Sequence, residues 1–280
     1  MFKLSHLAAT VALVASTAAS ATAVVSYPDF SNTAGLTLNG GASVVSNALR
    51  VTNANFSQAG SAFSTSQVSL ATGASFSTYF QFRFSNAGGA CDTGTTCGAD
   101  GLVFVVQTNS NNVGGIGGGI GYAGVPNSIG IEFDTWNNGS GDNNSSNHVG
   151  IDVGGSVNSI LLAEVTEGDM NNGGIWNAWV DYDSTTTTLE VRLTQAVTRP
   201  TLALLSLNRN IALDLGSTNA YVGFTSGTGA AYANHDVLSW QLNDNFSPID
   251  PGNRVPEPGS LALAGAALAL LGAARRRAVR

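Results

Sequence analysis

Short runs in which apolar and polar residues alternate recur along the middle of the chain, separated by Gly, Asn, Ser and Thr. Residues 77–84 (STYFQFRF) alternate phenylalanines with Gln81 and Arg83, which is the period of a half-buried strand. Residues 101–106 (GLVFVV) indicate a strand that is buried on both faces. Further strands are predicted at residues 189–193, 220–226 and 235–242, with a hairpin at 179–188. No run has a convincing helical period, so the pattern predicts an all-β fold, an antiparallel β-sandwich or jelly roll.

Residues 129–136 (IGIEFDTW) place two carboxylates on one face of a predicted strand. With a period of two, the isoleucines and Phe133 face one side, whereas Glu132, Asp134 and Trp136 face the other. The first set suits a hydrophobic core. Neighbouring carboxylates repel each other unless they are protonated or bridged by cations, so the second set predicts a metal site.

The segment after this strand contains no apolar residue between positions 137 and 147. Its oxygen donors include Asn138, Asp142, Asn143 and Asn144. His148 then opens a second predicted strand, residues 148–152 (HVGID). Calcium binds roughly six to eight hard oxygen atoms, and a histidine with carboxylates suits a transition metal such as manganese. A flexible polar loop is the alternative, but long loops without structure are uncommon in compact domains unless they are functional. We therefore expect ions to organise this loop.

Both ends of the chain carry features of targeting signals. Residues 1–23 combine an early lysine, an apolar run and small residues, which predicts a secretory signal peptide cleaved after Ala23. Residues 251–280 contain Pro-Glu-Pro, a short apolar stretch and then a run of three arginines at residues 275–277. This order resembles the PEP-CTERM sorting tail, which implies processing by an exosortase-type enzyme, with transient membrane anchoring, and a final place at the cell surface or in the extracellular matrix. A plain C-terminal anchor is the alternative. The domain itself is expected at residues 24–250.

Charge and cysteine usage narrow the function further. Between the two signals, residues 24–250 contain five arginines and seventeen acidic residues, a net charge of 5 − 17 = −12 with histidines neutral. Such an acidic surface excludes nucleic acid as a partner and suits cations or neutral ligands. Cys91 and Cys97 are the only cysteines, and in an exported chain their spacing predicts a small disulfide loop.

The chain resembles the legume-type (L-type) lectins from about Val25 to Asp244. The resemblance rests on the order of several short stretches, among them ADGLVFVV, GGGIGYAG, SIGIEFDTWNN, HVGIDV, WNAWVDYD and HDVLSWQL. It implies a concanavalin-like sandwich and a calcium-dependent carbohydrate-binding protein that is not an enzyme. Members of this family often pair through a flat sheet, so a homodimer is a further expectation.

The resemblance also implies a set of metal ligands for Ca²⁺ and for Mn²⁺ or another transition metal. These are Glu132, Asp134, Trp136 through its carbonyl, Asn138, Asp142 and His148. In this family a second aspartate, later in the loop, binds both metals. The family spacing places it at Asn143, one residue after Asp142. We expect Asp142 to be the ligand, with a one-residue adjustment of the loop.

The sugar site implied by the resemblance uses Asp100, Gly118 and Asn138, with Gly119 as an alternative to Gly118. Trp136 or Tyr122 is expected to stack on the sugar ring. The resemblance further implies a cis Ala99–Asp100 peptide. The loop that tunes sugar preference is expected to be lined by Gly229, Ala230, Ala231 and Tyr232.

Two other functions remain open from the residues. A glycan hydrolase on a related sandwich would use paired carboxylates, but its E-x-D-x-E motif would need a second glutamate where this chain has Trp136. A matrix protein that kept the lectin fold without sugar binding would share the polar surface and the sorting tail. No G-x-S-x-G motif precedes a helix, and we assign His235 a structural role.

Overall fold

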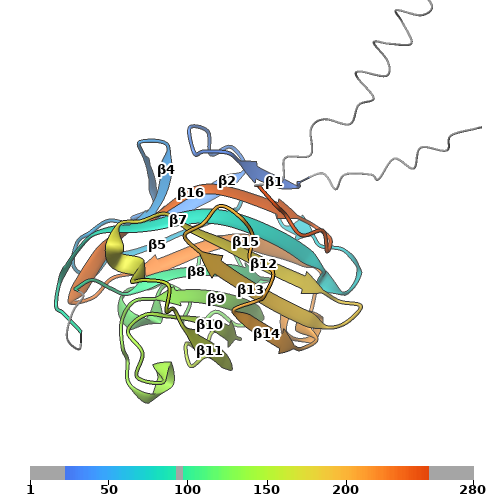
Figure 1. Cartoon of the computed structure of the whole chain (residues 1–280). Coiled ribbons are helices and arrows are strands. Elements are labelled where there is room, and N and C mark those ends of the chain that lie inside the picture. Colours follow the sequence, from blue (N-terminus) through green and yellow to red (C-terminus); the bar gives the residue numbers. More distant parts are fainter. Residues whose placement is uncertain (1–22, 93–96, 252–280) are drawn as a thin grey trace, which may run out of the picture.

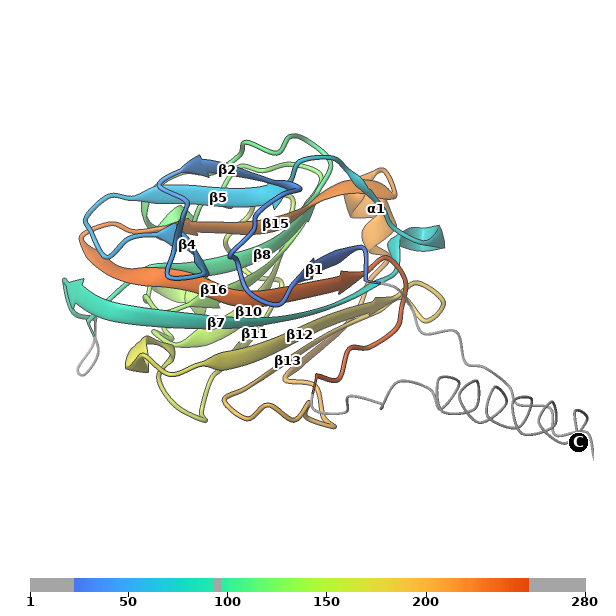
Figure 2. The same ribbon diagram turned by 90° about the horizontal axis from the view of Figure 1, so that it is seen from above.

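Two antiparallel sheets face each other in this computed structural model, which describes residues 23–92 and 97–251. Each sheet has eight strands in the described part of the chain (Figures 1 and 2). The all-β antiparallel sandwich expected from the sequence is therefore confirmed.

The first sheet, called the β7 sheet, has the strand order β14-β13-β12-β7-β16-β4-β3, with β1 paired to β16. Its strands are β1 (Val25–Tyr27), β3 (Ser43–Val45), β4 (Ala48–Thr52), β7 (Phe76–Gly89), β12 (Trp176–Asp183), β13 (Thr188–Thr194), β14 (Leu205–Asn208) and β16 (Ala231–Asn243). The expected hairpin at residues 179–188 is the turn between β12 and β13.

The second sheet, called the β9 sheet, has the order β11-β10-β9-β8-β15-β5-β2, with β6 paired to β15. Its strands are β2 (Leu36–Gly40), β5 (Ala59–Ser64), β6 (Val68–Ser69), β8 (Gly101–Gln107), β9 (Ser128–Asp134), β10 (His148–Val153), β11 (Leu161–Glu164) and β15 (Asn219–Gly227). Helical structure in the described residues is limited to α1 (Ile211–Leu215) and the 3₁₀ turns η1 (Thr72–Ala74), η2 (Gly117–Gly119), η3 (Ser140–Asp142) and η4 (Met170–Asn172).

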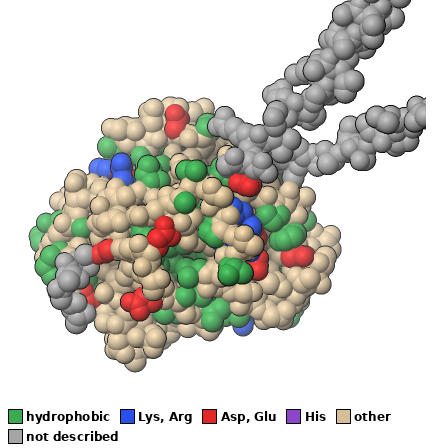
Figure 3. All heavy atoms as spheres, in the orientation of Figure 1, with side chains coloured by type: hydrophobic (Ala, Val, Ile, Leu, Met, Phe, Trp, Pro, Cys, Tyr) green, Lys and Arg blue, Asp and Glu red, His purple; other side chains and the backbone are tan. Residues whose placement is uncertain are grey.

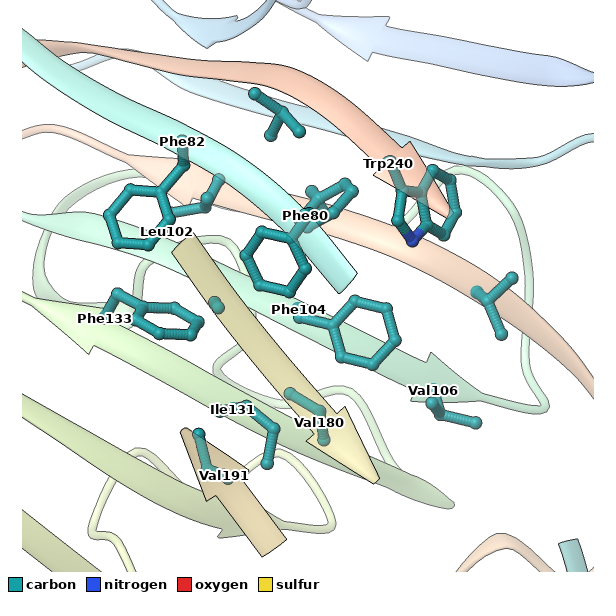
Figure 4. Packing of buried hydrophobic residues seen from close by; sticks show 14 of the residues in the cluster. Phe80, Phe82, Leu102, Phe104, Val106, Ile131, Phe133, Val180, Val191 and Trp240 are labelled. Carbon is teal, nitrogen blue, oxygen red and sulfur yellow. The ribbon is translucent and has the colours of Figure 1, made fainter. Parts of the chain in front are cut away.

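The main core fills the space between the two sheets (Figure 4). Phe80 of β7 lies at its centre, with ring centroids 5.6 Å from Phe133 of β9 and 5.0 Å from Phe224 of β15. Both aromatic pairs meet edge to face, the arrangement that the ring quadrupole favours. The period-two pattern of the sequence therefore corresponds to the faces that the sheets turn toward each other.

A second, smaller core covers the outer face of the β9 sheet. It consists of Phe63, Val103, Val105, Ile120, Tyr122 and Val125. Because Ile120 and Tyr122 follow η2 directly, their burial anchors the glycine-rich segment to the sheet. This packing also explains why β8 is buried on both faces, as its apolar sequence predicted.

Strand register brings the candidate site residues to one end of the β9 sheet. Gly101 of β8 pairs with Asp134 of β9 on one side and with Gly227 of β15 on the other. Asp134 in turn pairs with His148 of β10. This end, where β7 also finishes, lies opposite α1 (Figure 2).

The expected signal peptide (residues 1–23) and sorting tail (residues 251–280) lie outside the described part of the chain, apart from Ala23 and Pro251. Among the described residues, no helix is long and apolar enough to cross a membrane.

Candidate functional site

Glu132, Asp134 and His148 form a buried cluster where β9 and β10 meet. One potential ligand atom from each residue lies within 4.8 Å of the others, and Nε2 of His148 is 3.4 Å from Oε1 of Glu132. Glu132 and Asp134 share a face because they are two residues apart on one strand, and β10 pairing adds His148 from the next strand. The metal cluster predicted from the strand pattern is thus brought together by the fold.

The electrostatics of this cluster favour a cation. Burial and the nearby Glu132 carboxylate raise the pKa of Asp134 well above its usual range. Both ring nitrogens of His148 are buried and make no hydrogen bond. In the described part of the chain, no arginine forms an ion pair with this cluster. Two carboxylates and an imidazole that makes no hydrogen bond fit a divalent metal, which would supply the missing positive charge.

Asp142 belongs to the η3 turn and is buried, but it lies outside the group of three residues whose ligand atoms are within 4.8 Å of one another. Burial raises the pKa of Asp142. The hydrogen bond from Asn138 and the charge of His148 lower this pKa, whereas the charge of Glu132 raises it. The backbone N–H of Asn138 donates a hydrogen bond to Oδ2 of Asp142. Asn143, the alternative ligand, is exposed and has a left-handed backbone with φ of 53°. This arrangement favours Asp142 over Asn143.

Polar contacts replace hydrophobic packing in the loop between β9 and β10. Nδ2 of Asn137 donates to the carbonyl of Asn144 at 2.9 Å, and Oδ1 of Asn137 accepts from the N–H of Gly139 at 2.7 Å. The N–H of Trp136 donates to Oδ1 of Asp134 at 2.6 Å, and Trp136 is half-buried. Hydrogen bonds of its own side-chain and backbone amide groups thus hold the loop in shape.

Two further residues of the cluster were not singled out from the sequence. Asp152 lies on the same face of β10 as His148, four residues further on, and is buried. The Ser159 hydroxyl oxygen lies 2.6 Å from Oε1 of Glu132 and 2.8 Å from Oδ1 of Asp152. Burial and the Glu132 charge raise the pKa of Asp152 well above its usual range. The period of two in HVGID already placed Asp152 on this face, whereas no sequence signal pointed to Ser159.

The disulfide loop also contacts the loop between β9 and β10, which we call the metal loop because it carries the candidate ligands Asn138 and Asp142. Cys91 and Cys97 are bonded to each other, which confirms the predicted bridge. Oδ2 of Asp92, inside the bridged segment, accepts a hydrogen bond from the N–H of Asn137 at 2.6 Å. This contact joins residues that are 45 positions apart, so no local pattern could have revealed it.

Asp100 lies at the same end of the sheet, directly before β8. The Ala99–Asp100 peptide is cis, as the resemblance implied. The Asp100 backbone is held by three hydrogen bonds: its N–H donates to the Gly227 carbonyl at 3.2 Å, and its carbonyl accepts from the N–H of Thr135 at 2.9 Å and from the Thr135 hydroxyl at 3.2 Å. Burial raises the pKa of the Asp100 carboxyl to about 7, and its Oδ2 has no hydrogen-bond partner. A carboxylate oxygen without a partner beside the glycine turn suits a hydroxylated ligand.

The η2 turn brings Gly118 against the side chain of Asn138. A Cβ atom on Gly118 would lie 2.8 Å from Nδ2 of Asn138, so a side chain here would displace that amide. A Cβ atom on Gly119 would instead meet Ala123. The geometry therefore favours Gly118 over Gly119 as the glycine that borders the site.

The loop between β15 and β16 closes the site on its other side. A Cβ atom on Gly229 would lie 3.7 Å from Oδ2 of Asp100 and 3.7 Å from Cα of Gly117. Ala230 is exposed, whereas the Ala231 side chain is buried at the start of β16. Of the two predicted alanines, only Ala230 offers its side chain to a ligand.

One predicted aromatic role is wrong. Tyr122 is buried in the second core, with its hydroxyl 2.8 Å from Oγ of Ser128, so it cannot stack on a sugar. The apolar neighbours of Tyr122 come from β5 and β8, which the local sequence does not show. Trp136 remains the candidate for stacking.

Known sequences match almost the whole described chain. Residues 23–257 match the legume lectin domain, and residues 254–278 match the PEP-CTERM protein-sorting motif. The chain is 31% identical over 236 residues to the L-type lectin-domain containing receptor kinase SIT2 of Oryza sativa subsp. japonica, covering 76% of this chain and 34% of the kinase. It is 32% identical over 167 residues to a seed lectin of Styphnolobium japonicum, covering 55% of this chain and 53% of the lectin. The chain thus spans about a third of the receptor kinase and half of the seed lectin.

Solved lectins share the fold. The basic winged bean lectin with Tn-antigen has a TM-score of 0.63 at 28% identity, covering 78% of this chain and 96% of that chain. Lectin I-B4 from Griffonia simplicifolia, in its metal free form, has a TM-score of 0.64 at 25% identity, covering 78% and 98%. Since the domain match spans both sheets and the whole candidate site, the chain belongs to the legume lectin domain family.

Proposed function

We propose that this protein is an exported, calcium-dependent carbohydrate-binding protein that acts at the cell surface or in extracellular polysaccharide. The observation that carries the proposal is the convergence of Asp100, the η2 glycines, Asn138 and Gly229 beside a buried carboxylate–histidine cluster. Relatives with solved structures include a lectin complexed with Tn-antigen, which supports a carbohydrate ligand.

Each proposed binding residue supplies a different kind of contact to a sugar. The Asp100 carboxylate accepts hydrogen bonds from hydroxyls, the N–H of Gly118 donates one, and the Asn138 amide donates another. The half-buried Trp136 offers an aromatic surface to the apolar face of the ring. Because water competes for every hydroxyl, these groups bind well only when they are held in place beforehand.

A divalent cation is the proposed source of that order. Glu132, Asp134, Asp142 and His148 would hold it, with oxygen atoms from Trp136 and Asn138 in addition. The bound cation supplies positive charge that offsets the buried carboxylates. Calcium is the proposed main ion and manganese, or another transition metal, the second.

The sorting motif at residues 254–278 supports export and a processing enzyme of the exosortase type as a partner. We propose that cleavage there leaves the lectin domain at the cell surface or in the matrix.

The test is retention of the purified domain on a panel of immobilised glycans, with and without calcium. We expect retention in calcium, loss in chelator, and at least a tenfold loss of affinity in Asp100→Ala. The Ala variant must keep the melting temperature of the wild type, and Asp183→Ala, in the β12–β13 turn at the far end of the sandwich, is the matched control.

Other outcomes would decide against the proposal. A domain that binds metal but no glycan would be a structural matrix protein with a lectin fold. Release of free sugar from a glucan would instead identify a hydrolase.

A further inference from the structure

An exposed aromatic pair lies beside the proposed sugar site. Phe56, in the loop between β4 and β5, is 60% exposed and is the most exposed phenylalanine in the described part of the chain. Its ring meets Tyr232 of β16 edge to face, with centroids 4.9 Å apart and an angle of 89°. We call Phe56 and Tyr232 the aromatic rim. Single exposed apolar side chains are normal on a protein surface, but here two aromatic rings lie together beside the candidate site, where they offer a ligand an apolar surface.

The loop that carries Phe56 is bonded directly to the loop that borders the sugar site. The N–H of Ser57 donates to the carbonyl of Gly229 at 3.1 Å. The N–H of Thr228 donates to Gln58 at 2.9 Å, and the N–H of Gln58 donates to the Thr228 hydroxyl at 2.8 Å. That hydroxyl donates to the carbonyl of Asn55 at 2.7 Å. Four hydrogen bonds therefore fasten the two loops together.

This connection makes the aromatic rim continuous with Asp100. Gly229, to which Ser57 is bonded, is the residue whose added Cβ would lie 3.7 Å from Oδ2 of Asp100. The neighbouring Thr228 carbonyl accepts from the N–H of Gly117 at 3.0 Å. The same backbone segment thus borders the proposed sugar position on one side and supports Phe56 on the other.

The rim is also held rigidly. Nε2 of Gln58 donates to the carbonyl of Phe56 at 2.9 Å, and the N–H of Ala54 donates to Oδ1 of Asn234 at 2.8 Å. The Tyr232 ring lies over Gly88, where a Cβ atom would come within 2.9 Å of the ring. These contacts order the backbone around Phe56 and the place of the Tyr232 ring before a ligand arrives, which lowers the entropy cost of binding.

We propose that the aromatic rim is a second subsite, which binds the next sugar residue of a glycan chain whose first residue occupies the Asp100 site. This inference rests on the proposed function. The exposed face of Phe56 matches the apolar face of a pyranose ring, and the exposed Asn55 side chain beside it offers an amide for hydroxyls. The site therefore takes an oligosaccharide or polysaccharide chain in preference to a single sugar.

The experiment compares two ligands on one protein by titration calorimetry. The ligands are the monosaccharide retained best by the wild-type domain and a linear tetrasaccharide of the same sugar. We expect Phe56→Ala to bind the monosaccharide within twofold of wild type but the tetrasaccharide about tenfold more weakly, which corresponds to about 1.4 kcal/mol. Phe56→Trp should restore tetrasaccharide binding because it keeps an aromatic face.

The matched control is Leu213→Ala, which removes an 80% exposed apolar side chain from α1 at the far end of the sandwich and should change neither affinity. If Phe56→Ala leaves the tetrasaccharide affinity unchanged, or weakens both ligands equally, the subsite is refuted while the lectin function stands. A wild-type protein that binds neither ligand refutes the proposed function and the subsite with it. If Phe56→Ala instead converts a dimer into a monomer in light scattering, the rim is a contact between copies of this chain.

Discussion

The two histidines that the structure describes are both fully buried, yet their surroundings differ. His148 faces Glu132 and Asp134, whereas His235 packs edge-on against Phe84 and bonds through Nδ1 to the Thr52 hydroxyl at 2.7 Å. Burial lowers the pKa of His235 to about 3, so it is neutral at ordinary pH. This fits the structural role assigned to His235 from the sequence.

The buried His235 should make the domain sensitive to mild acid. Its pKa in the folded chain is lowered to about 3 from 6.5, so the unfolded chain binds the proton more readily. The contribution of neutral His235 to stability is therefore fully present above pH 6.5 and is lost as the pH falls from 6.5 toward 3. We expect the contribution of His235 to the free energy of unfolding to fall by about 3 kcal/mol between pH 7 and pH 4.

Urea unfolding of the wild type and His235→Asn at both pH values measures this cost. Chelator in every sample keeps metal binding out of the comparison. Because the raised pKa values of Asp100, Asp134 and Asp152 stabilise both proteins as the pH falls, the test is the difference between them. Between pH 7 and pH 4 the unfolding free energy of the wild type should change by about 3 kcal/mol in the destabilising direction relative to the variant. An equal change in both proteins would contradict the role of His235.

At the scale of elements, the strands follow from local sequence but the contacts between loops do not. The alternation in residues 77–84 and 129–134 predicted which side chains enter the core, because a strand exposes its faces with a fixed period of two. The hydrogen bond from Asn137 to Asp92 depends on where two distant loops meet. The same holds for the packing of Tyr122, whose stacking role could not be judged before its neighbours were known.

The Asp92 contact predicts that the disulfide loop positions the metal loop. Asp92→Ala removes the acceptor for the N–H of Asn137, which directly precedes the proposed sugar ligand Asn138. A hydrogen bond to a charged group contributes about 1.5–3 kcal/mol, so we expect sugar affinity to fall by roughly tenfold.

Asp92→Asn keeps an acceptor oxygen and should lose less affinity than the Ala variant, which separates the hydrogen bond from the charge. Titration calorimetry at saturating calcium measures both. Wild-type affinity in Asp92→Ala would show that the metal loop holds its shape without this contact.

At the scale of the whole molecule, the few positive charges among the described residues are already paired. Every arginine in the described part of the chain forms an ion pair with a carboxylate: Arg50 and Arg83 with Asp236, Arg192 and Arg199 with Asp181, and Arg209 with Asp214. On the face seen in Figure 3, acidic side chains are scattered and basic ones are few. This distribution agrees with a neutral or cationic ligand.

A homodimer was expected through a flat sheet, and the outer face of the β7 sheet is partly covered by its own chain. Nε1 of Trp179, which points away from the main core, donates to the carbonyl of Ile249 at 2.8 Å. The homodimer stays a prediction, and its interface would have to include or displace this C-terminal segment.

Calcium should stabilise the folded domain as a whole. A ligand at a hundred times its dissociation constant stabilises by about 2.7 kcal/mol, which for a domain of this size raises the melting temperature by about 5–10 °C. Calorimetric scans of the wild type in calcium and in chelator measure the shift. We expect Asp142→Asn to lose the calcium-dependent shift and Asn143→Ala to keep it. The reverse pattern would show that Asn143 is the ligand.

The sequence by itself determined the strands β7 to β10, β12, β13, β15 and β16, the sandwich, the pairing of the cysteines and the carboxylates that face away from the core. These features depend on residue type, on spacing along one strand or on closeness along the chain. Only the tertiary structure decided that Asp92 and Ser159 join the site, that Tyr122 is buried and that the aromatic rim lies beside the site. These outcomes depend on which loops lie together at the end of the β9 sheet. The register of the strands decides this, and it is fixed by pairing between residues that are far apart in the chain.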